Sequence, residues 1–217
     1  MQERFIATAI HGRYLTVPPA APGPAPVLVG FHGYSEDAEI HLERLRAIPG
    51  NDRWLTVSIQ ALHRFYQRRT NLVGASWMTR QDRETAIADN VAYVNKCIDA
   101  VAAEWPTLPT IVFAGFSQGV GMAFRAAVHL SHGTASVIAA GGDIPPEIVP
   151  ADLSRVSAAL IARGTLDGFY TAEQFDKDEQ RLRSCSVSVN ALRFDGGHEW
   201  SGDLVDAASQ FLRERHP

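Results

Sequence analysis

Six short apolar runs recur along the chain at intervals that suit strands separated by helices. They contain few charged residues, each ends at or near Gly, Gln or Asp, and they cover residues 26–31, 54–59, 110–116, 135–141, 157–163 and 188–194. A nearly unbroken apolar run indicates a strand that is buried on both faces, as in a parallel sheet.

Between these runs the apolar residues follow the helical period. From Arg83 to Trp105 they are spaced four, three, four, three and four residues apart, which makes one stripe along a helix, and Pro106 ends it. Residues 201–215 repeat the spacing, and the charged residues 171–184 predict a surface helix. This alternation predicts an α/β fold, a mostly parallel sheet with helices on both faces. Ligands bind at the carboxyl ends of strands in such sheets, so residues that follow a strand are the first candidates for chemistry.

The segment before the first buried strand is expected to be peripheral. Residues 1–17 place two apolar-rich stretches around His11-Gly12, which predicts an N-terminal hairpin. Residues 18–26, "PPAAPGPAP", predict a stiff surface connection rather than a domain boundary, because too little chain precedes them to fold alone. We therefore expect one domain over residues 1–217.

Composition narrows the classes of partner. The net charge of −4 disfavours nucleic acid and anionic membranes, and no run approaches the roughly 18 apolar residues of a membrane span. The first ten residues lack the pattern of a secretory signal. Two distant cysteines, Cys97 and Cys185, are too few for a disulfide framework and are expected to be free thiols. These features predict a cytoplasmic protein.

The stretch "FAGFSQG", residues 113–119, places Ser117 between two glycines. It follows an apolar strand and precedes a good helical stretch, which is the context of a nucleophile elbow. Gly115 and Gly119 would remove side chains that clash where strand and helix close together. The alternative is an ordinary strand–helix turn with an inert serine.

A serine alcohol needs a base to take its proton, and the base needs an orienting acid. Asp167 lies in the loop after strand 157–163, and His198 follows the last strand in a loop that Gly196 and Gly197 make pliable. The order Ser117, Asp167, His198 suits an elbow-type hydrolase.

Two other acids stay open at this point. Asp143 follows strand 135–141, and some related sheets supply the acid one strand earlier. Asp195 lies only three residues before His198, an awkward position from which to orient that ring.

The chain resembles the α/β-hydrolase superfamily, and within it the compact carboxylesterase/phospholipase group that includes acyl-protein thioesterases. The supporting residues are "GFHGYSE", "AGFSQGVGMA", "RGTLDGF" and "GGHEW", at 30–36, 114–123, 163–169 and 196–200. Gln118 after the nucleophile is typical of that group. The chain departs from the pattern where the glycine-acid continuation of the early His-Gly loop reads Tyr34-Ser35-Glu36. It departs again in the acid loop, "RGTLDGFY", where many relatives carry a His-Gly opening and an Asp-Pro.

The resemblance implies an α/β-hydrolase fold over residues 26–215 and no cofactor. In such folds two backbone N–H groups bind the oxyanion, which by position are those of Gln118 and Tyr34. His32 is expected to organise the loop through hydrogen bonds to the backbone.

Other polar and aromatic residues have two interpretations. His129 and His132 lie three residues apart, but no carboxylate or cysteine stands nearby at ligand spacing, so we expect solvated side chains and no metal. In the stretch 63–81, Phe65, Tyr66 and Trp77 could wall an acyl pocket or pack locally. The arginines of that stretch could attract an anionic leaving group or be solvated; they include Arg64, Arg68 and Arg69.

The leading hypothesis is a serine hydrolase that cleaves carboxylic esters or thioesters through an acyl-enzyme. No segment is long enough for a helical lid domain, which favours small or short-chain substrates. The alternatives are a peptidase or amidase that uses the same residues and a non-catalytic binding protein. The sequence does not specify an oligomeric state.

Overall fold

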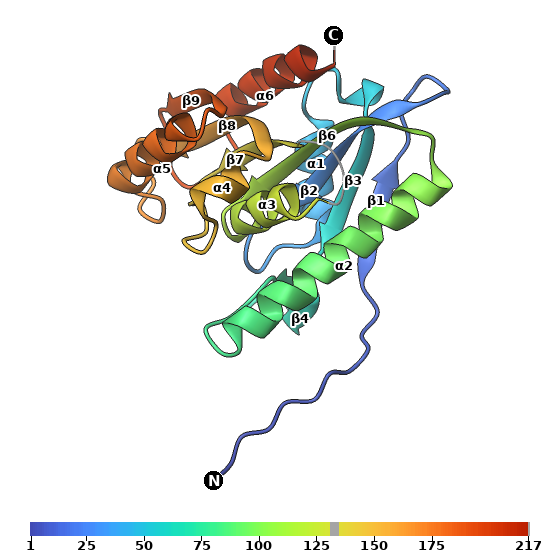
Figure 1. Cartoon of the computed structure of the whole chain (residues 1–217), viewed down its shortest axis with the longest axis vertical. Coiled ribbons are helices and arrows are strands. Elements are labelled where there is room, and N and C mark those ends of the chain that lie inside the picture. The colour runs from blue at the N-terminus through green and yellow to red at the C-terminus, as the bar shows by residue number, and fades with distance from the viewer. Residues whose placement is uncertain (131–134, 217) are drawn as a thin grey trace.

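Seven strands form one sheet in the computed structural model, which describes residues 1–130 and 135–216 (Figure 1). Their order across the sheet is β1-β3-β2-β6-β7-β8-β9. All neighbours are parallel except β1, which runs antiparallel to β3. The strands are β1 Arg13–Val17, β2 Ala25–Phe31, β3 Leu55–Gln60, β6 Thr107–Phe116, β7 Ala135–Ala140, β8 Val156–Gly164 and β9 Ser188–Phe194. The predicted mostly parallel sheet is confirmed.

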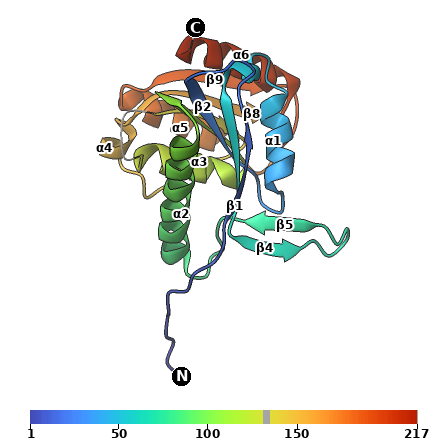
Figure 2. The same cartoon turned by 90° about the vertical axis from the view of Figure 1, so that its right-hand side faces the viewer.

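Helices cover both faces of this sheet, as Figure 2 shows for α2 and α3 on one side and α1 on the other. The helices are α1 Ala38–Arg46, α2 Arg83–Glu104, α3 Gln118–Val128, α4 Pro150–Leu153, α5 Ala172–Ser184 and α6 Gly202–Arg215, and a 3-10 turn spans Asn51–Arg53. The helices expected over 83–105, 171–184 and 201–215 are therefore confirmed to within a residue or two at their ends.

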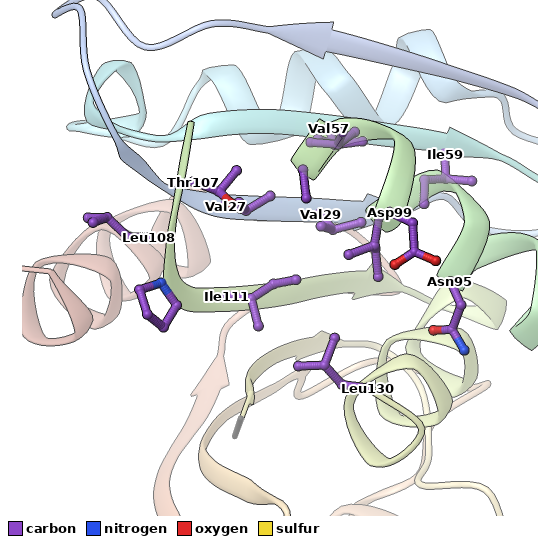
Figure 3. A pocket seen from close by; sticks show the side chains of 14 residues that line it. Val27, Val29, Val57, Ile59, Asn95, Asp99, Thr107, Leu108, Ile111 and Leu130 are labelled. Carbon is purple, nitrogen blue, oxygen red and sulfur yellow. The ribbon is translucent and has the colours of Figure 1, made fainter. Parts of the chain in front are cut away.

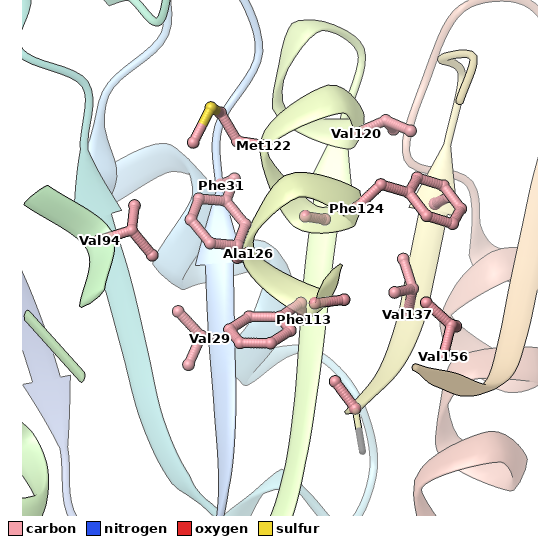
Figure 4. Packing of buried hydrophobic residues seen from close by; sticks show 14 of the residues in the cluster. Val29, Phe31, Val94, Phe113, Val120, Met122, Phe124, Ala126, Val137 and Val156 are labelled. Atoms are coloured by element: carbon pink, nitrogen blue, oxygen red, sulfur yellow. The ribbon is translucent and has the colours of Figure 1, made fainter. Parts of the chain in front are cut away.

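The core has two halves because alternate residues of a strand point to opposite faces. Val29, Phe113 and Val137 lie on the face covered by α2 and α3, where they pack with Val94 and Phe124 (Figure 4). The intervening residues pack on the other face with α1 and α6, and they include Leu28, Val112 and Ile138. A central sheet buried on both sides explains why these strands are almost entirely apolar.

The predicted N-terminal hairpin is wrong. Strand β1 pairs with β3, and residues 1–12 run away from the body of the molecule (Figures 1 and 2). The Tyr93 hydroxyl accepts a hydrogen bond from the N–H of Arg13 and donates one to its carbonyl, each at 2.8 Å. A Cβ on Gly12 would overlap the Tyr93 ring. Gly12 thus makes room for a side chain of α2 instead of forming a turn, and residues 18–24 link β1 to β2.

The stretch 63–81 contains a second, two-stranded sheet that the sequence did not predict. Strands β4, His63–Tyr66, and β5, Val73–Ser76, form an antiparallel hairpin. This hairpin projects from the body of the molecule next to β1 (Figure 2). An isolated bridge between Glu36 and Ala75 joins it to the loop after β2.

Candidate active site

Ser117 occupies the sharp turn between β6 and α3. Its backbone has φ 53° and ψ −119°, a region that side chains other than glycine rarely adopt. Its N–H donates to the carbonyl of Ala140 at 2.9 Å, which fixes the turn against the end of β7. The strained backbone expected of a nucleophile elbow is therefore present.

The two glycines flanking Ser117 are required by close backbone contacts. A Cβ on Gly119 would overlap the carbonyl of Phe31, and one on Gly115 would overlap the carbonyl of Gly119. The start of α3 thus packs directly on the end of β2. This packing places the loop that begins with His32 beside the serine turn.

His198 lies in the loop after β9 and contacts both other candidate residues. Its Nε2 is 2.9 Å from Ser117 Oγ, and its Nδ1 is 2.8 Å from Asp167 Oδ2. An ionised carboxylate only accepts, so Nδ1–H donates to Asp167 and Nε2 is left to accept from the serine hydroxyl. The three residues, far apart in sequence, therefore form one chain of hydrogen bonds.

Asp167 is held rigidly in the loop after β8. Its Oδ1 accepts hydrogen bonds from the N–H groups of Phe169 at 2.8 Å and Tyr170 at 3.1 Å. Its side chain is only 1% exposed. Burial alone would raise the pKa of Asp167, but the hydrogen bonds from His198, Tyr170 and Phe169 outweigh it, and the pKa lies below its ordinary value. The carboxylate stays ionised opposite the imidazole.

The structure brings neither alternative acid to His198. Asp195 lies 3.5 Å from Thr165 Oγ1. Asp143 lies within electrostatic reach of Arg125 and Tyr170. Within the described residues, the carboxylate that contacts the imidazole belongs to Asp167.

Two aromatic rings flank the imidazole. The ring centroids of Phe116 and Phe169 each lie 5.0 Å from that of His198. Phe169 is 80% exposed, so its free face borders the site. The imidazole itself is only 19% exposed and is confined by these neighbours.

The candidate oxyanion donors lie at the start of α3 and in the loop after β2. Gln118 is the first residue of α3, so its N–H has no acceptor within the helix, and the helix dipole favours negative charge there. Tyr34 is the second residue of a turn closed by the Glu36 N–H and the Gly33 carbonyl, which leaves its own N–H outside that hydrogen bond. Both positions can present a backbone donor.

An ion pair that the sequence did not single out shapes the Tyr34 turn. Glu36 Oε2 accepts the N–H of Gly33 at 2.7 Å. Arg44 of α1 binds both carboxylate oxygens of Glu36, at 2.6 and 2.7 Å. The Arg44 guanidinium also lies 4.3 Å from the ring centroid of Phe116.

The hairpin β4–β5 supports the same turn from the other side. Ser35, with φ 65°, donates its N–H to the Ala75 carbonyl at 2.9 Å, and Ala75 donates back to Glu36 at 2.8 Å. Gln67 Nε2 donates to the Ser35 carbonyl at 2.6 Å. The rings of Tyr34 and Phe65 lie 5.6 Å apart. These long-range contacts explain why the hairpin was missed from local pattern alone.

His32 organises the loop as predicted. Its Nδ1 donates to the Gly33 carbonyl at 2.7 Å, and its Nε2 accepts the N–H of Ala61 at 3.0 Å. Burial lowers the pKa of His32, which keeps the ring neutral and able to accept. It is therefore committed to structure and is not available as a base.

Trp77 packs locally instead of lining an acyl pocket. It is fully buried and donates its Nε1–H to the His32 carbonyl at 2.9 Å. The Gln118 side chain fixes the same segment, accepting from the Trp77 N–H at 2.9 Å and donating to the Met78 carbonyl at 3.0 Å. The glutamine after the serine thus ties the elbow to β5. Tyr66 stays exposed, as do the basic side chains at the hairpin tip, Arg68 and Arg69.

Two further features concern binding partners. Within residues 1–130 and 135–216, no group of three or more His, Cys, Asp or Glu side chains has an arrangement that could hold a metal ion, and His132 lies outside the described residues. The described helices include none with the length and apolarity to cross a bilayer.

A family comparison agrees with this geometry. The model of the phospholipase/carboxylesterase family matches residues 24–216. The chain belongs to this family. It is thus an enzyme of the serine carboxylesterase/thioesterase type. A search of proteins with curated functions finds no match.

Solved structures share the α/β-hydrolase fold of this family member. Esterase PE8 is 22% identical with a TM-score of 0.73, covering 95% of this chain and 100% of its own. The Bacillus cereus carboxylesterase is 15% identical with a TM-score of 0.71, covering 94% of each chain. Zea mays acyl-protein thioesterase 2 is 16% identical with a TM-score of 0.71, covering 94% of this chain and 99% of its own.

Proposed function

We propose that the protein hydrolyses carboxylic esters or thioesters through an acyl-enzyme on Ser117. The observation that carries the proposal is the hydrogen-bonded chain from Ser117 Oγ through His198 to Asp167, with distances of 2.9 and 2.8 Å. A serine becomes a useful nucleophile when an oriented base removes its proton.

In the first half of the reaction, Ser117 Oγ attacks the carbonyl carbon while its proton moves to His198 Nε2. The carbonyl oxygen gains negative charge and accepts hydrogen bonds from the N–H groups of Gln118 and Tyr34. The intermediate collapses as the bond from carbon to the leaving oxygen or sulfur breaks. His198 gives its proton to the departing alkoxide or thiolate, which leaves the acyl group on Ser117.

In the second half, water attacks the acyl carbon and gives a proton to His198. The bond to Ser117 Oγ breaks, the serine recovers that proton and the acid leaves. Asp167 stays ionised throughout, holds the Nδ1–H tautomer and stabilises the imidazolium that forms twice per turnover.

We infer that the preferred substrates carry small or short acyl chains. Phe169 and Tyr34 border the site with largely exposed side chains, 80% and 61% respectively. Trp77, which could have walled a deep pocket, is buried beneath the His32 loop. We also infer a reducing, cytoplasmic setting, which the two free cysteines support.

The test is hydrolysis of p-nitrophenyl butyrate by Ser117→Ala. We expect kcat/KM to fall by about 10⁴ or more, since the residues of such a unit act together. Ser184→Ala, at the exposed end of α5, is the control and should retain full activity. An undiminished rate in Ser117→Ala would remove this residue from the mechanism. The matched anilide, assayed beside the ester, tests the amidase alternative, which would show comparable rates on both.

A further inference from the structure

A cavity lies between α2 and the sheet, and Ser117 is not among the residues that line it. It has a volume of about 250 Å³ and is lined mostly by apolar side chains of β2, β3, β6 and α2 (Figure 3). The lining includes Val29 of β2, Val57 and Ile59 of β3, Ile98 of α2 and Ile111 of β6.

The cavity lining does not include Ser117, Asp167 or His198, although it reaches Ile59 near the carboxyl end of β3. Thr107 and Ile111, near the start of β6, line the cavity, whereas Ser117 follows the last residue of that strand. Six residues of extended chain from Ile111 to Ser117 span about 20 Å at roughly 3.3 Å per residue. Since none of the three candidate active-site residues lines the cavity, an occupant there would not touch the reacting atoms.

The size and lining of the cavity favour an apolar occupant. Protein interiors are close-packed, and voids larger than a water molecule are few. A void lined by aliphatic side chains holds water poorly, and one of about 150 Å³ binds benzene. A cavity of about 250 Å³ has room for a larger molecule, such as an aliphatic chain of about eight carbons.

One charged side chain sets the preferred head group. Of the lining residues in the described part of the chain, Asp99 is the ionisable one, and Asn95 lies one helical turn before it on α2. Asp99 is exposed, so it lies where the cavity meets solvent. A carboxylate there attracts an ammonium group and repels another carboxylate.

We propose that this cavity binds a short-chain aliphatic amine, with the chain between α2 and the sheet and the ammonium group beside Asp99. The site would discriminate against fatty acids of the same length. It is thus distinct in both place and charge preference from a site that releases a carboxylic acid.

The experiment is titration of Ser117→Ala protein with octylammonium, octanol and octanoate, followed by calorimetry and by methyl NMR of the valine and isoleucine side chains. The serine is removed so that the candidate active site cannot turn over a ligand. We expect octylammonium to bind and to shift the Val57 and Ile98 methyl signals, with octanoate several-fold weaker because attraction to the exposed Asp99 becomes repulsion. Shifts confined to residues around Ser117, or octanoate binding as tightly as octylammonium, would overturn the proposal.

Matched variants test the binding of the aliphatic chain and of the ammonium group separately. Ala102 lines the cavity and is exposed, so Ala102→Trp should block it and abolish binding. Ala103→Trp, one residue along α2 and outside the lining, should bind normally. Equal binding of octylammonium by the two tryptophan variants would overturn the proposed location of the site.

To test the head group, Asp99→Asn should weaken the binding of octylammonium two- to fivefold, roughly the contribution of an exposed ion pair. The affinity for octanol should not change. Asp89→Asn, on the same helix but outside the lining, should change neither. An unchanged octylammonium affinity in Asp99→Asn would contradict the proposed role of the carboxylate.

Discussion

Glu36 Oε2 accepts the backbone N–H of Gly33 at 2.7 Å, one residue before the candidate oxyanion donor Tyr34. Arg44 holds the Glu36 carboxylate by two hydrogen bonds and covers the ring of Phe116, which in turn packs against His198. The pair is about four-fifths buried, with side chains 19% and 20% exposed. A single ion pair therefore supports both the oxyanion loop and one side of the imidazole.

We predict that Glu36→Gln lowers kcat about 10- to 100-fold with little change in KM. The glutamine removes the charge that fixes Arg44 and weakens the acceptor for Gly33, so the Tyr34 N–H is less well placed. Removing an oxyanion donor completely lowers kcat by a factor of about 10²–10³, and a displaced donor should cost no more than that. Steady-state kinetics on a short-chain ester measure both constants.

Glu39→Gln is the control for that variant. Glu39 lies on the same helix and also pairs with an arginine, Arg13, but both side chains are about half exposed, 53% and 43%. Such pairs contribute little to stability. We expect normal kinetics from Glu39→Gln; a loss equal to that of Glu36→Gln would mean that α1, and not the Gly33 contact, is responsible.

The identity of the orienting acid is tested by comparing Asp167→Asn with Asp143→Asn. Asp167→Asn should lower kcat by about 10⁴, because the amide favours the wrong imidazole tautomer. Asp143→Asn should stay within about threefold of the parent, since it is Asp167 that contacts the imidazole. The reverse pattern in ester hydrolysis would reassign the acid.

The lowered pKa of Asp167 also predicts how the stability deficit of Asp167→Asn depends on pH. The folded-state pKa is below the unfolded one, so this carboxylate stabilises the fold above its ordinary pKa near 3.9. That contribution is lost as the pH falls through the folded value. Denaturant unfolding should therefore show a deficit for Asp167→Asn at pH 7 that shrinks toward pH 3. A deficit that grows on acidification would contradict the assigned direction.

Gly119→Ala should destabilise the protein sharply, by about 3 kcal/mol or more, because the new methyl group overlaps the Phe31 carbonyl and a backbone atom cannot rotate away. A Cβ on Gly197, in the His198 loop, would have no heavy atom within 4 Å. The free energy of unfolding of Gly197→Ala should therefore lie within about 0.5 kcal/mol of the parent value. Thermal and denaturant unfolding of the two variants compare a close-packed glycine with an open one. Equal stability would mean that α3 can move off β2.

The two thiols should differ in reactivity. Burial raises the pKa of Cys97 to about 11, so at pH 8 only about one molecule in a thousand carries the thiolate that reacts. Cys185 is half-buried at the end of α5. Titration with a disulfide reagent at pH 8 should modify one thiol in the folded protein and two after unfolding. Rapid modification of both in the folded state would contradict this packing.

The features that could be predicted from sequence pattern are those that depend on residues close together in the chain. The α2 stripe, the buried strands and the small residues around Ser117 each follow from neighbours in sequence. The order of Ser117, Asp167 and His198 along the strands was also sufficient to nominate residues that the structure places in contact.

The features that were missed depend on partners distant in sequence. The local pattern predicts a turn at Gly12, but the role of this residue is set by Tyr93, which lies on α2. The role of Glu36 depends on Arg44 and on its hydrogen bond to Gly33, which form only when the loop is folded. The hairpin β4–β5 depends on its pairing with Glu36 and on the Gln118 side chain, which no periodicity reveals.

Covalent labelling of the serine tests whether Ser117 is the nucleophile that His198 activates. Folded protein is treated with a fluorophosphonate, and the product is measured by intact mass and peptide mapping. We expect one adduct per chain, on Ser117, absent in Ser117→Ala and formed far more slowly in His198→Ala. No adduct on the folded protein, or equal labelling of the Ser117→Ala variant, would contradict it.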